Sequence, residues 1–316
     1  MEAVKFDNNP ALPDIVELKN VTQEYPSKDG KGKVTVIKDL NMLIEDRPGI
    51  GEFVVVLGAS GCGKSTLLRY ICGLQKPTSG EVLIRGKAPE LTDPISMVFQ
   101  QYSNLPWLTV LDNVCLGLKL AGVKKTERKE KGMAMLKTVG LEAQAEKYAK
   151  YPNLSGGQLQ RVAIARCMLT NPSVILFDEP FGALDINTRL RMQNMINDIW
   201  LDAMKQKKEL SAVFVTHDIA EAVYLADEIW IMRANPGQIV ERIMIDLPLD
   251  RTKELKREKR FTDLVYEIED KMTRISAMSE AALPQEPAAP AAPVVSLAST
   301  TTEAAASYPS ERKITS

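Results

Sequence analysis

Short runs of β-branched and aromatic residues, each bounded by turn residues, recur from residue 15 to residue 250. Four of these runs are FVVVLG, SMVF, VILF and AVFV. Continuous apolar runs of this length are typical of parallel strands that are covered on both faces. Helical stretches alternate with them, among them KSTLLRYICGL, GQLQRVAIARCML and NTRLRMQNMINDIWLDAM. The alternation predicts an α/β fold built on a wound, mostly parallel sheet.

The segment 102–164 interrupts this alternation because it is helical and charged, as in GVKKTERKEKGMAMLKTVGL. We interpret it as a helical subdomain inserted into an α/β core that comprises residues 15–101 and 165–250. A solvated helix surface accounts for its charge run better than a docking face, which remains the alternative.

Beyond the core, residues 251–280 have the pattern of one charged helix. Its apolar positions at helical spacing are Phe261, Leu264, Val265 and Ile268. We expect this helix to pack against the core, with a regulatory or membrane-surface role as the alternative. Residues 281–316 are rich in Ala, Pro, Ser and Thr. They bury too little apolar area to offset the entropy of ordering, so we expect a disordered tail.

Composition limits the class of protein. Forty Lys and Arg against 41 Asp and Glu leave a net charge of −1, so no global basic field points to a nucleic-acid partner. Any phosphate must therefore be held locally. No stretch approaches the ~20 apolar residues of a membrane span. The cysteines lack metal-ligand spacing and are expected to be reduced thiols in a cytosol; they are Cys62, Cys72, Cys115 and Cys167.

The most specific local motif is GASGCGKST, residues 58–66, which fits G-x-x-x-x-G-K-[ST], follows the run FVVVL and opens a helix. Its glycines let backbone N–H groups surround a β-phosphate, while Lys64 neutralises phosphate charge and Ser65 ligates Mg²⁺. A plain glycine-rich turn is the weaker alternative. The candidate nucleotide ligands are Gly58, Ser60, Gly61, Cys62, Gly63, Lys64, Ser65 and Thr66. Cys62 is interpreted as a small residue at a tolerant position, although Lys64 and a helix N-terminus favour its thiolate.

Polar side chains follow three further apolar runs. Asp178 and Glu179 end VILFDEP, Gln100 ends SMVFQ, and AVFVTH delivers His217, the single histidine of the chain. Ligands of open α/β sheets bind at the carboxyl ends of the strands, so these residues and the loop 58–66 are expected to share one crevice. Asp178 is a candidate Mg²⁺ partner and Glu179 a carboxylate that orients and polarises water.

One more motif, LSGGQ at residues 154–158, precedes the helix LQRVAIARCML. Together with GASGCGKST, FDEP, GALD and THD it resembles the ATP-binding-cassette (ABC) ATPases over roughly residues 15 to 250. The resemblance implies a P-loop NTPase core with a mostly parallel sheet, an antiparallel β region near the N-terminus, the inserted helical subdomain, and ATP with Mg²⁺ as cofactors.

The resemblance also implies residue roles. Tyr25 would stack on adenine, with an ordinary strand aromatic as the alternative. Gln100 would contact Mg²⁺ and sense a membrane partner, Glu179 would be the general base, and His217 would contact the γ-phosphate. Lys64 and Gln100 complete the catalytic set. Residues that would act across a head-to-tail dimer, on ATP held by the other cassette, are Ser155, Gly156, Gly157, Gln158 and Asp185.

The residues themselves support this arrangement. Ser155 is a good helix cap followed by two glycines, so the chain has two phosphate-binding helix starts but only one lysine-bearing loop. A homodimer of ATPase subunits, or a heterodimer with a second cassette, would combine one start from each chain around each ATP.

Two shorter stretches, NLPWLTVLDNV and NPGQIVERIMIDLP, resemble the ATPase subunits of nitrate, sulfonate, taurine and bicarbonate importers. This likeness implies separate transmembrane permease subunits, indirectly a solute-binding protein, and a peripheral place on the cytoplasmic face of the inner membrane. The alternatives are an importer for another solute, an exporter and, less favoured, a soluble cassette protein acting on DNA or ribosomes. That last class has a long coiled-coil insertion or tandem cassettes, and neither pattern occurs here.

Overall fold

The computed structural model describes residues 14–27, 30–45, 51–91, 95–206, 208 and 210–281. The tail expected at 281–316 lies outside this description apart from Ala281, the last residue of the final helix.

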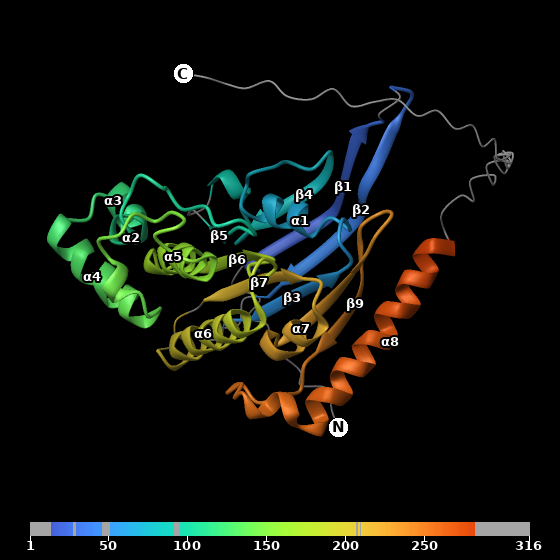
Figure 1. Cartoon of the computed structure of the whole chain (residues 1–316). Helices are drawn as coiled ribbons and strands as arrows, with labels where there is room; N and C mark the ends of the chain where they lie inside the picture. Colours follow the sequence, from blue (N-terminus) through green and yellow to red (C-terminus); the bar gives the residue numbers. More distant parts are fainter. Residues whose placement is uncertain are drawn as a thin grey trace, which may run out of the picture. The chain divides into compact units, whose positions relative to one another are not determined.

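A six-stranded sheet forms the centre of the fold, in the order β5-β6-β7-β3-β8-β9 (Figure 1). Its strands are β3 (Phe53–Gly58), β5 (Ser96–Val98), β6 (Val174–Asp178), β7 (Ser211–Thr216), β8 (Glu228–Arg233) and β9 (Gln238–Met244). All neighbours pair in parallel except β8 and β9. Every residue of β3, β6 and β7 is buried, as continuous apolar runs predicted.

The two edges of this sheet differ from its centre. β5 is only three residues long, and β9 alternates partly buried and exposed positions. Arg242 of β9 pairs with Glu228 of β8 at 2.7 Å and stacks over the ring of Trp230 at 4.6 Å. The exposed residues of the edge strand are Val240, Arg242 and Met244, and the side chain of Arg242 is held by the neighbouring strand.

An antiparallel sheet of three strands lies near the N-terminus, in the order β2-β1-β4. It consists of β1 (Val16–Pro26), β2 (Lys33–Ile44) and β4 (Ser79–Ile84). Both predicted sheet types are therefore confirmed. Ile37 of β2 forms an isolated β-bridge with Gly237, which directly precedes β9, so the antiparallel sheet contacts the central sheet there.

The helices are α1 (Lys64–Ile71), α2 (Val110–Val114), α3 (Leu116–Leu120), α4 (Lys125–Thr138), α5 (Gly156–Leu169), α6 (Ile186–Lys205), α7 (Ile219–Leu225) and α8 (Lys259–Ala281), with short 3-10 turns at η1 (Pro89–Leu91), η2 (Glu142–Gln144) and η3 (Glu254–Arg257). Helices α2 to α5 gather beside β5, and α2, α4 and α5 share a small core of their own (Figure 1). Helix α5 runs across the boundary predicted at residues 164 and 165, because it packs both on this core and on β5.

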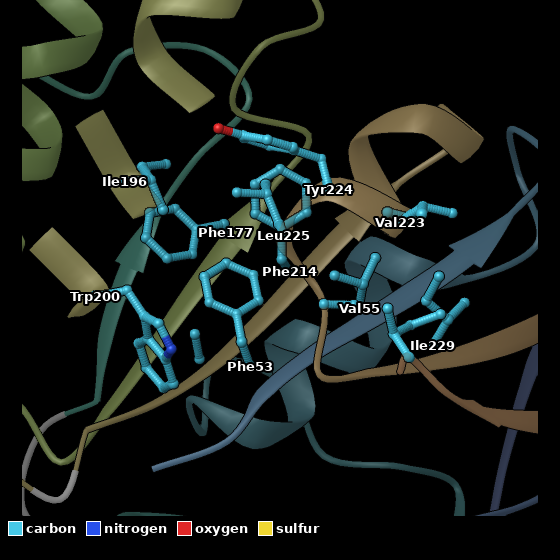
Figure 2. Close-up of a cluster of buried hydrophobic side chains, with 14 of the residues drawn as sticks. Phe53, Val55, Phe177, Ile196, Trp200, Phe214, Val223, Tyr224, Leu225 and Ile229 are labelled. Carbon is cyan, nitrogen blue, oxygen red and sulfur yellow. The ribbon is translucent and has the colours of Figure 1, made fainter. Parts of the chain in front are cut away.

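Two apolar cores cover the two faces of the central sheet. Alternate residues of β3 enter them: Val55 and Leu57 on one face, Val54 and Val56 on the other. On the first face, phenylalanines from neighbouring strands pack against α6 and α7 (Figure 2). Trp200 meets Phe53 edge to face, with ring centroids 5.3 Å apart. Burying such a side chain contributes about 1.5–3 kcal/mol, so the strand ends that carry the polar motifs are firmly held.

Helix α8 extends the first core. Phe261, Leu264 and Ile268 are buried in it, and Val265 packs partly buried beside them. Lys271 on the same helix forms a salt bridge to Glu241 of β9.

Candidate functional site

The loop between β3 and α1 is shaped by glycine. Gly61 and Gly63 have φ of +80° and +108°, a left-handed backbone that side-chain-bearing residues adopt only under strain. Lys64 Nζ folds back to donate hydrogen bonds to the carbonyl oxygens of Gly58 and Ala59, at 2.9 and 3.1 Å. Among the described residues no side chain caps α1, so its first N–H groups are available to an anion.

Five predicted residues meet at this loop. Lys64 Nζ lies 3.1 Å from Glu179 Oε1, and the other oxygen of Glu179 lies 3.1 Å from His217 Nδ1. Ser65 Oγ donates a hydrogen bond of 2.8 Å to Asp178 Oδ1. Residues from three strand ends, far apart in sequence, therefore form one contiguous polar site.

The backbone at Glu179 is unusual for a residue with a side chain. Its φ is +41°, its N–H donates to Val215 O and its carbonyl accepts from Gly182 N, each at 3.1 Å. Holding a non-glycine residue in this region costs about 1–3 kcal/mol and is typical of functional sites. The turn aims the carboxylate at Lys64 and His217, a detail that the sequence pattern does not reveal.

Ser65 and Asp178 have the chemistry of a magnesium site. Burial raises the pKa of Asp178, while the hydrogen bond from Ser65 opposes that shift. Mg²⁺ prefers hydroxyl and carboxylate oxygens and keeps water or phosphate as its other ligands. No group of three His, Cys, Asp or Glu side chains suited to a metal occurs in the described part of the chain. The two residues therefore fit an ion whose ligand set is completed by phosphate and water.

Gln100 lies next to the Glu179 turn, since a Cβ built on Gly182 would be 3.7 Å from its Nε2. The segment 99–104, which contains Gln100, is tied to α5 by hydrogen bonds that sequence reasoning missed. They run from Gln160 Nε2 to Phe99 O, from Arg166 to Ser103 O and Oγ, and from Asn104 Nδ2 to Leu159 O, at 2.6 to 3.3 Å. The chain on both sides of Gln100 is thus hydrogen-bonded to the helix that begins with SGGQ.

The start of α5 is closed by a capping box. Gln158 N donates to Ser155 Oγ at 3.3 Å, and Ser155 N donates to Gln158 Oε1 at 2.9 Å. Asp185 caps α6 in a similar way by accepting from Thr188 N at 3.0 Å. The two helix starts adjoin, because a Cβ on Gly157 would lie only 2.5 Å from Thr188 Cγ2. Ser155 and Asp185 therefore lie on one exposed surface built by the starts of α5 and α6, and Gly157 is buried between the two helices.

Tyr25 lies on β1, opposite Val34 of β2. Its hydroxyl accepts a hydrogen bond from Gln75 Nε2 at 2.8 Å, and 41% of the residue is exposed. Part of its ring surface is therefore open to a flat ligand.

Cys62 differs from the expectation that its surroundings favour a thiolate. The residue is 1% exposed, and its sulfur would be 2.8 Å from a Cβ on Gly58. Burial raises the pKa of the Cys62 thiol and outweighs the nearby Lys64. The Cys62 side chain therefore packs beneath the loop.

Comparisons with known proteins establish the family to which the chain belongs. A sequence profile described as "ABC transporter" matches residues 37–182. "Nitrate import ATP-binding protein NrtD" of Synechocystis sp. is 44% identical over 255 residues, which is 78% of this chain and 90% of that protein. "Taurine import ATP-binding protein TauB" of Escherichia coli (strain K12) is 43% identical over 233 residues, 73% of this chain and 85% of that protein.

Solved structures agree as well. The "Dimeric Structure of MJ0796, a Bacterial ABC Transporter Cassette" has a TM-score of 0.62 and 34% identity, and covers 74% of this chain and 100% of that one. The same cassette is described in a dimeric post-hydrolysis state bound to ADP and Pi, with the same similarity. The chain belongs to the ABC transporter family. It is an ATP-hydrolysing member that resembles the ATPases of nitrate and taurine import. Within the described residues, no helix is both long and apolar enough to cross a membrane.

Replacing Gly157 by Ala should destabilise the protein by about 1–3 kcal/mol, because the new methyl group overlaps Thr188 and pushes α5 from α6. Thermal unfolding measures the effect. Gly156→Ala is the matched control, since its Cβ meets only Tyr102 at 3.8 Å. Adding Thr188→Ser, which removes the overlapping methyl group, should restore most of the stability. Equal unfolding temperatures for both alanine variants would contradict the close approach.

Cys62 should resist alkylation in the folded protein. A raised pKa leaves less thiolate at a given pH, so iodoacetamide labelling at pH 8 should be slow and should accelerate about tenfold per pH unit above that. Peptide mass mapping follows the site, and the unfolded chain, in which the thiol is free, is the control. Labelling of folded Cys62 as fast as in the unfolded chain would exclude a buried thiol.

Proposed function

We propose that this chain is the ATPase subunit of an ABC importer. In a head-to-tail dimer it couples ATP binding and hydrolysis to the uptake of a small solute of the nitrate, sulfonate, taurine or bicarbonate kind, through separate transmembrane subunits. The observation that carries the chemistry is the placement of Glu179 between Lys64 and His217. The names of the similar nitrate and taurine import proteins support the direction of transport.

The phosphate groups of ATP would be held by the open N-terminus of α1 and by Lys64. Ser65, Asp178 and Gln100 would hold Mg²⁺, which supplies charge neutralisation at the β- and γ-phosphates when bound. Lys64 now pairs with Glu179. A phosphate is the stronger partner for a buried ammonium, so its arrival would release the Glu179 carboxylate.

Once released, Glu179 is placed to orient an attacking water and accept its proton. His217 lies against the other carboxylate oxygen, so it would fix the direction of Glu179 and donate a hydrogen bond toward the γ-phosphate. Positioning and charge stabilisation of this kind are most of what phosphoryl transfer requires.

Completing the site would need a second cassette. Ser155, Gly156 and Gly157 form a second helix start, and Asp185 adjoins it on the same surface. In the proposed dimer this surface faces the ATP on the partner's loop. Tyr25 would stack on adenine at the other end of the nucleotide.

A permease would dock on the exposed aromatic surface of the helical region. Trp107, Tyr148 and Tyr151 are 68%, 52% and 77% exposed, and the backbones of Leu108 and Ala149 are hydrogen-bonded beside them. Exposed aromatic residues are enriched at protein interfaces. Movement at Gln100 would reach this surface through the hydrogen bonds to α5. Docked on the permease, the chain would lie at the cytoplasmic face of the membrane. A solute-binding protein would deliver the solute to the permease on the opposite side.

Glu179→Gln should reduce ATP turnover by about 10²-fold or more, because the amide cannot accept the water's proton. The variant should also accumulate as an ATP-bound dimer, detected by size-exclusion chromatography with ATP. His217→Ala should lose about 10²-fold as well. Glu267→Gln on the exposed face of α8 serves as the control. Rapid hydrolysis by Glu179→Gln would refute the general-base assignment.

Trp107→Ala should lower the recovery of hydrophobic membrane subunits that co-purify with the chain from native membranes. Tyr266→Ala is the control, since this aromatic on α8 is equally exposed at 67%. Equal recovery with both variants would place the docking surface elsewhere. Co-purification of nucleic acid instead of membrane subunits would favour a soluble cassette protein.

A further inference from the structure

A buried polar cluster lies behind the loop that carries His217. Its centre is Glu221 of α7, whose side chain is only 7% exposed. The carboxylate accepts hydrogen bonds from Thr216 Oγ1 at 2.8 Å and from Gln193 Nε2 at 3.2 Å. None of these three residues touches Glu179 or Lys64 in the contacts described above, and the hydrolytic mechanism has not used them.

The cluster fixes the two neighbours of His217 in the chain. Thr216 Oγ1 donates to Glu221 and also accepts from Asp218 N at 3.0 Å. Asp218 Oδ1 in turn accepts from Glu221 N at 3.0 Å. The His217 side chain itself is 58% exposed, so little packing holds its ring. Its direction toward Glu179 therefore depends on how Thr216 and Asp218 are held.

The cluster also reaches the start of α6. Arg189 NH1 lies 3.4 Å from Asp218 Oδ2, and its Nε lies 3.7 Å from Glu221 Oε1. Arg189 is one turn into α6, and its N–H donates to the carbonyl of Asp185 at 2.8 Å. A shift of the Asp185 end of α6 would therefore change the distances between Arg189 and both carboxylates.

The charges in the cluster make the connection between the His217 loop and α6 sensitive to the position of Arg189. Burial raises the pKa of the Glu221 carboxyl, and the negative charge of Asp218 raises it further. The hydrogen bonds from Thr216 and Gln193 and the positive charge of Arg189 act in the opposite direction and favour the ionised carboxylate. Lys256 of η3 approaches from the other side and donates to Gln193 Oε1 at 2.5 Å. A buried carboxylate without its cation is strongly unfavourable, so the position of Arg189 has a large effect on the cluster.

We propose that Glu221 is a positioning residue for ATP hydrolysis. By holding Thr216 and Asp218 it directs His217 toward Glu179, and through Arg189 it makes that direction depend on the start of α6, where Asp185 lies. The proposal rests on the proposed function only for the role of His217 in turnover. The geometry of the cluster stands independently of it.

The test uses the single histidine of the chain. In protein labelled with histidine that is carbon-13 at Cε1 and carrying no histidine tag, the one labelled ring signal in an NMR spectrum reports on His217. Glu221→Gln keeps the shape but removes the charge, and Thr216→Val removes the hydroxyl. Both variants should shift the ring signal and lower kcat about tenfold with KM changed less than twofold, since misplacement affects turnover more than nucleotide binding.

Three further variants sharpen the result. Thr216→Ser keeps the hydroxyl and should restore the wild-type signal and kcat. Arg189→Met should shift the ring signal although it substitutes neither Thr216 nor Glu221, because both carboxylates of the cluster lose their cation. Tyr224→Phe, on the same helix α7, removes hydroxyl contacts to Asn194 and Arg251 only and should leave signal and kcat unchanged.

An unmoved His217 signal in folded Glu221→Gln would overturn the proposal, as would a loss of kcat without such a shift. If Glu221→Gln does not fold, Thr216→Val decides by the same criterion. An unmoved signal in Arg189→Met would overturn the link to α6. Full activity of His217→Ala would instead refute the proposed function, and the NMR shifts would still decide the positioning role.

Discussion

The contact between Lys64 and Glu179 is the interaction on which the site depends. Lys64 is 4% exposed, and a buried ammonium needs an anion or several oxygen acceptors to remain charged. Two carbonyl oxygens of its own loop and the Glu179 carboxylate meet this need. The second oxygen of the same carboxylate contacts His217. Glu179 therefore connects the ends of β3, β6 and β7 through these two contacts.

This arrangement keeps the reactive groups occupied by one another. Glu179, the proposed general base, neutralises Lys64 in this structure, and its left-handed backbone keeps its carboxylate aimed at that partner. The strain is tolerable because the strands beneath are buried at every position, and aromatic packing against α6 resists their displacement. In the proposed function a phosphate replaces the carboxylate at Lys64, so the buried sheet would provide the rigid support on which this ion pair is exchanged.

Much of this could be predicted from sequence, since apolar runs followed by polar residues mark the edge where parallel strands end. The loop 58–66, Asp178 and His217 were placed correctly at that edge for this reason. Patterns do not show how far a side chain reaches. The pairing of Lys64 with Glu179, the burial of Cys62 and the bonds from α5 to the Gln100 segment all depend on contacts between distant parts of the chain. The Glu221 cluster was missed for the same reason, because its arginine and glutamine come from α6.

The edges of the central sheet bear on how copies of this chain associate. Unpaired strand edges invite pairing with another molecule, which leads to aggregation. Here one edge is the three-residue β5, and the other is β9 with the stacked and paired Arg242. A short edge strand discourages strand addition, and on β9 the charge of Arg242 opposes it between the exposed Val240 and Met244. Both features act at the sheet edges, away from the nucleotide face through which dimerisation is proposed.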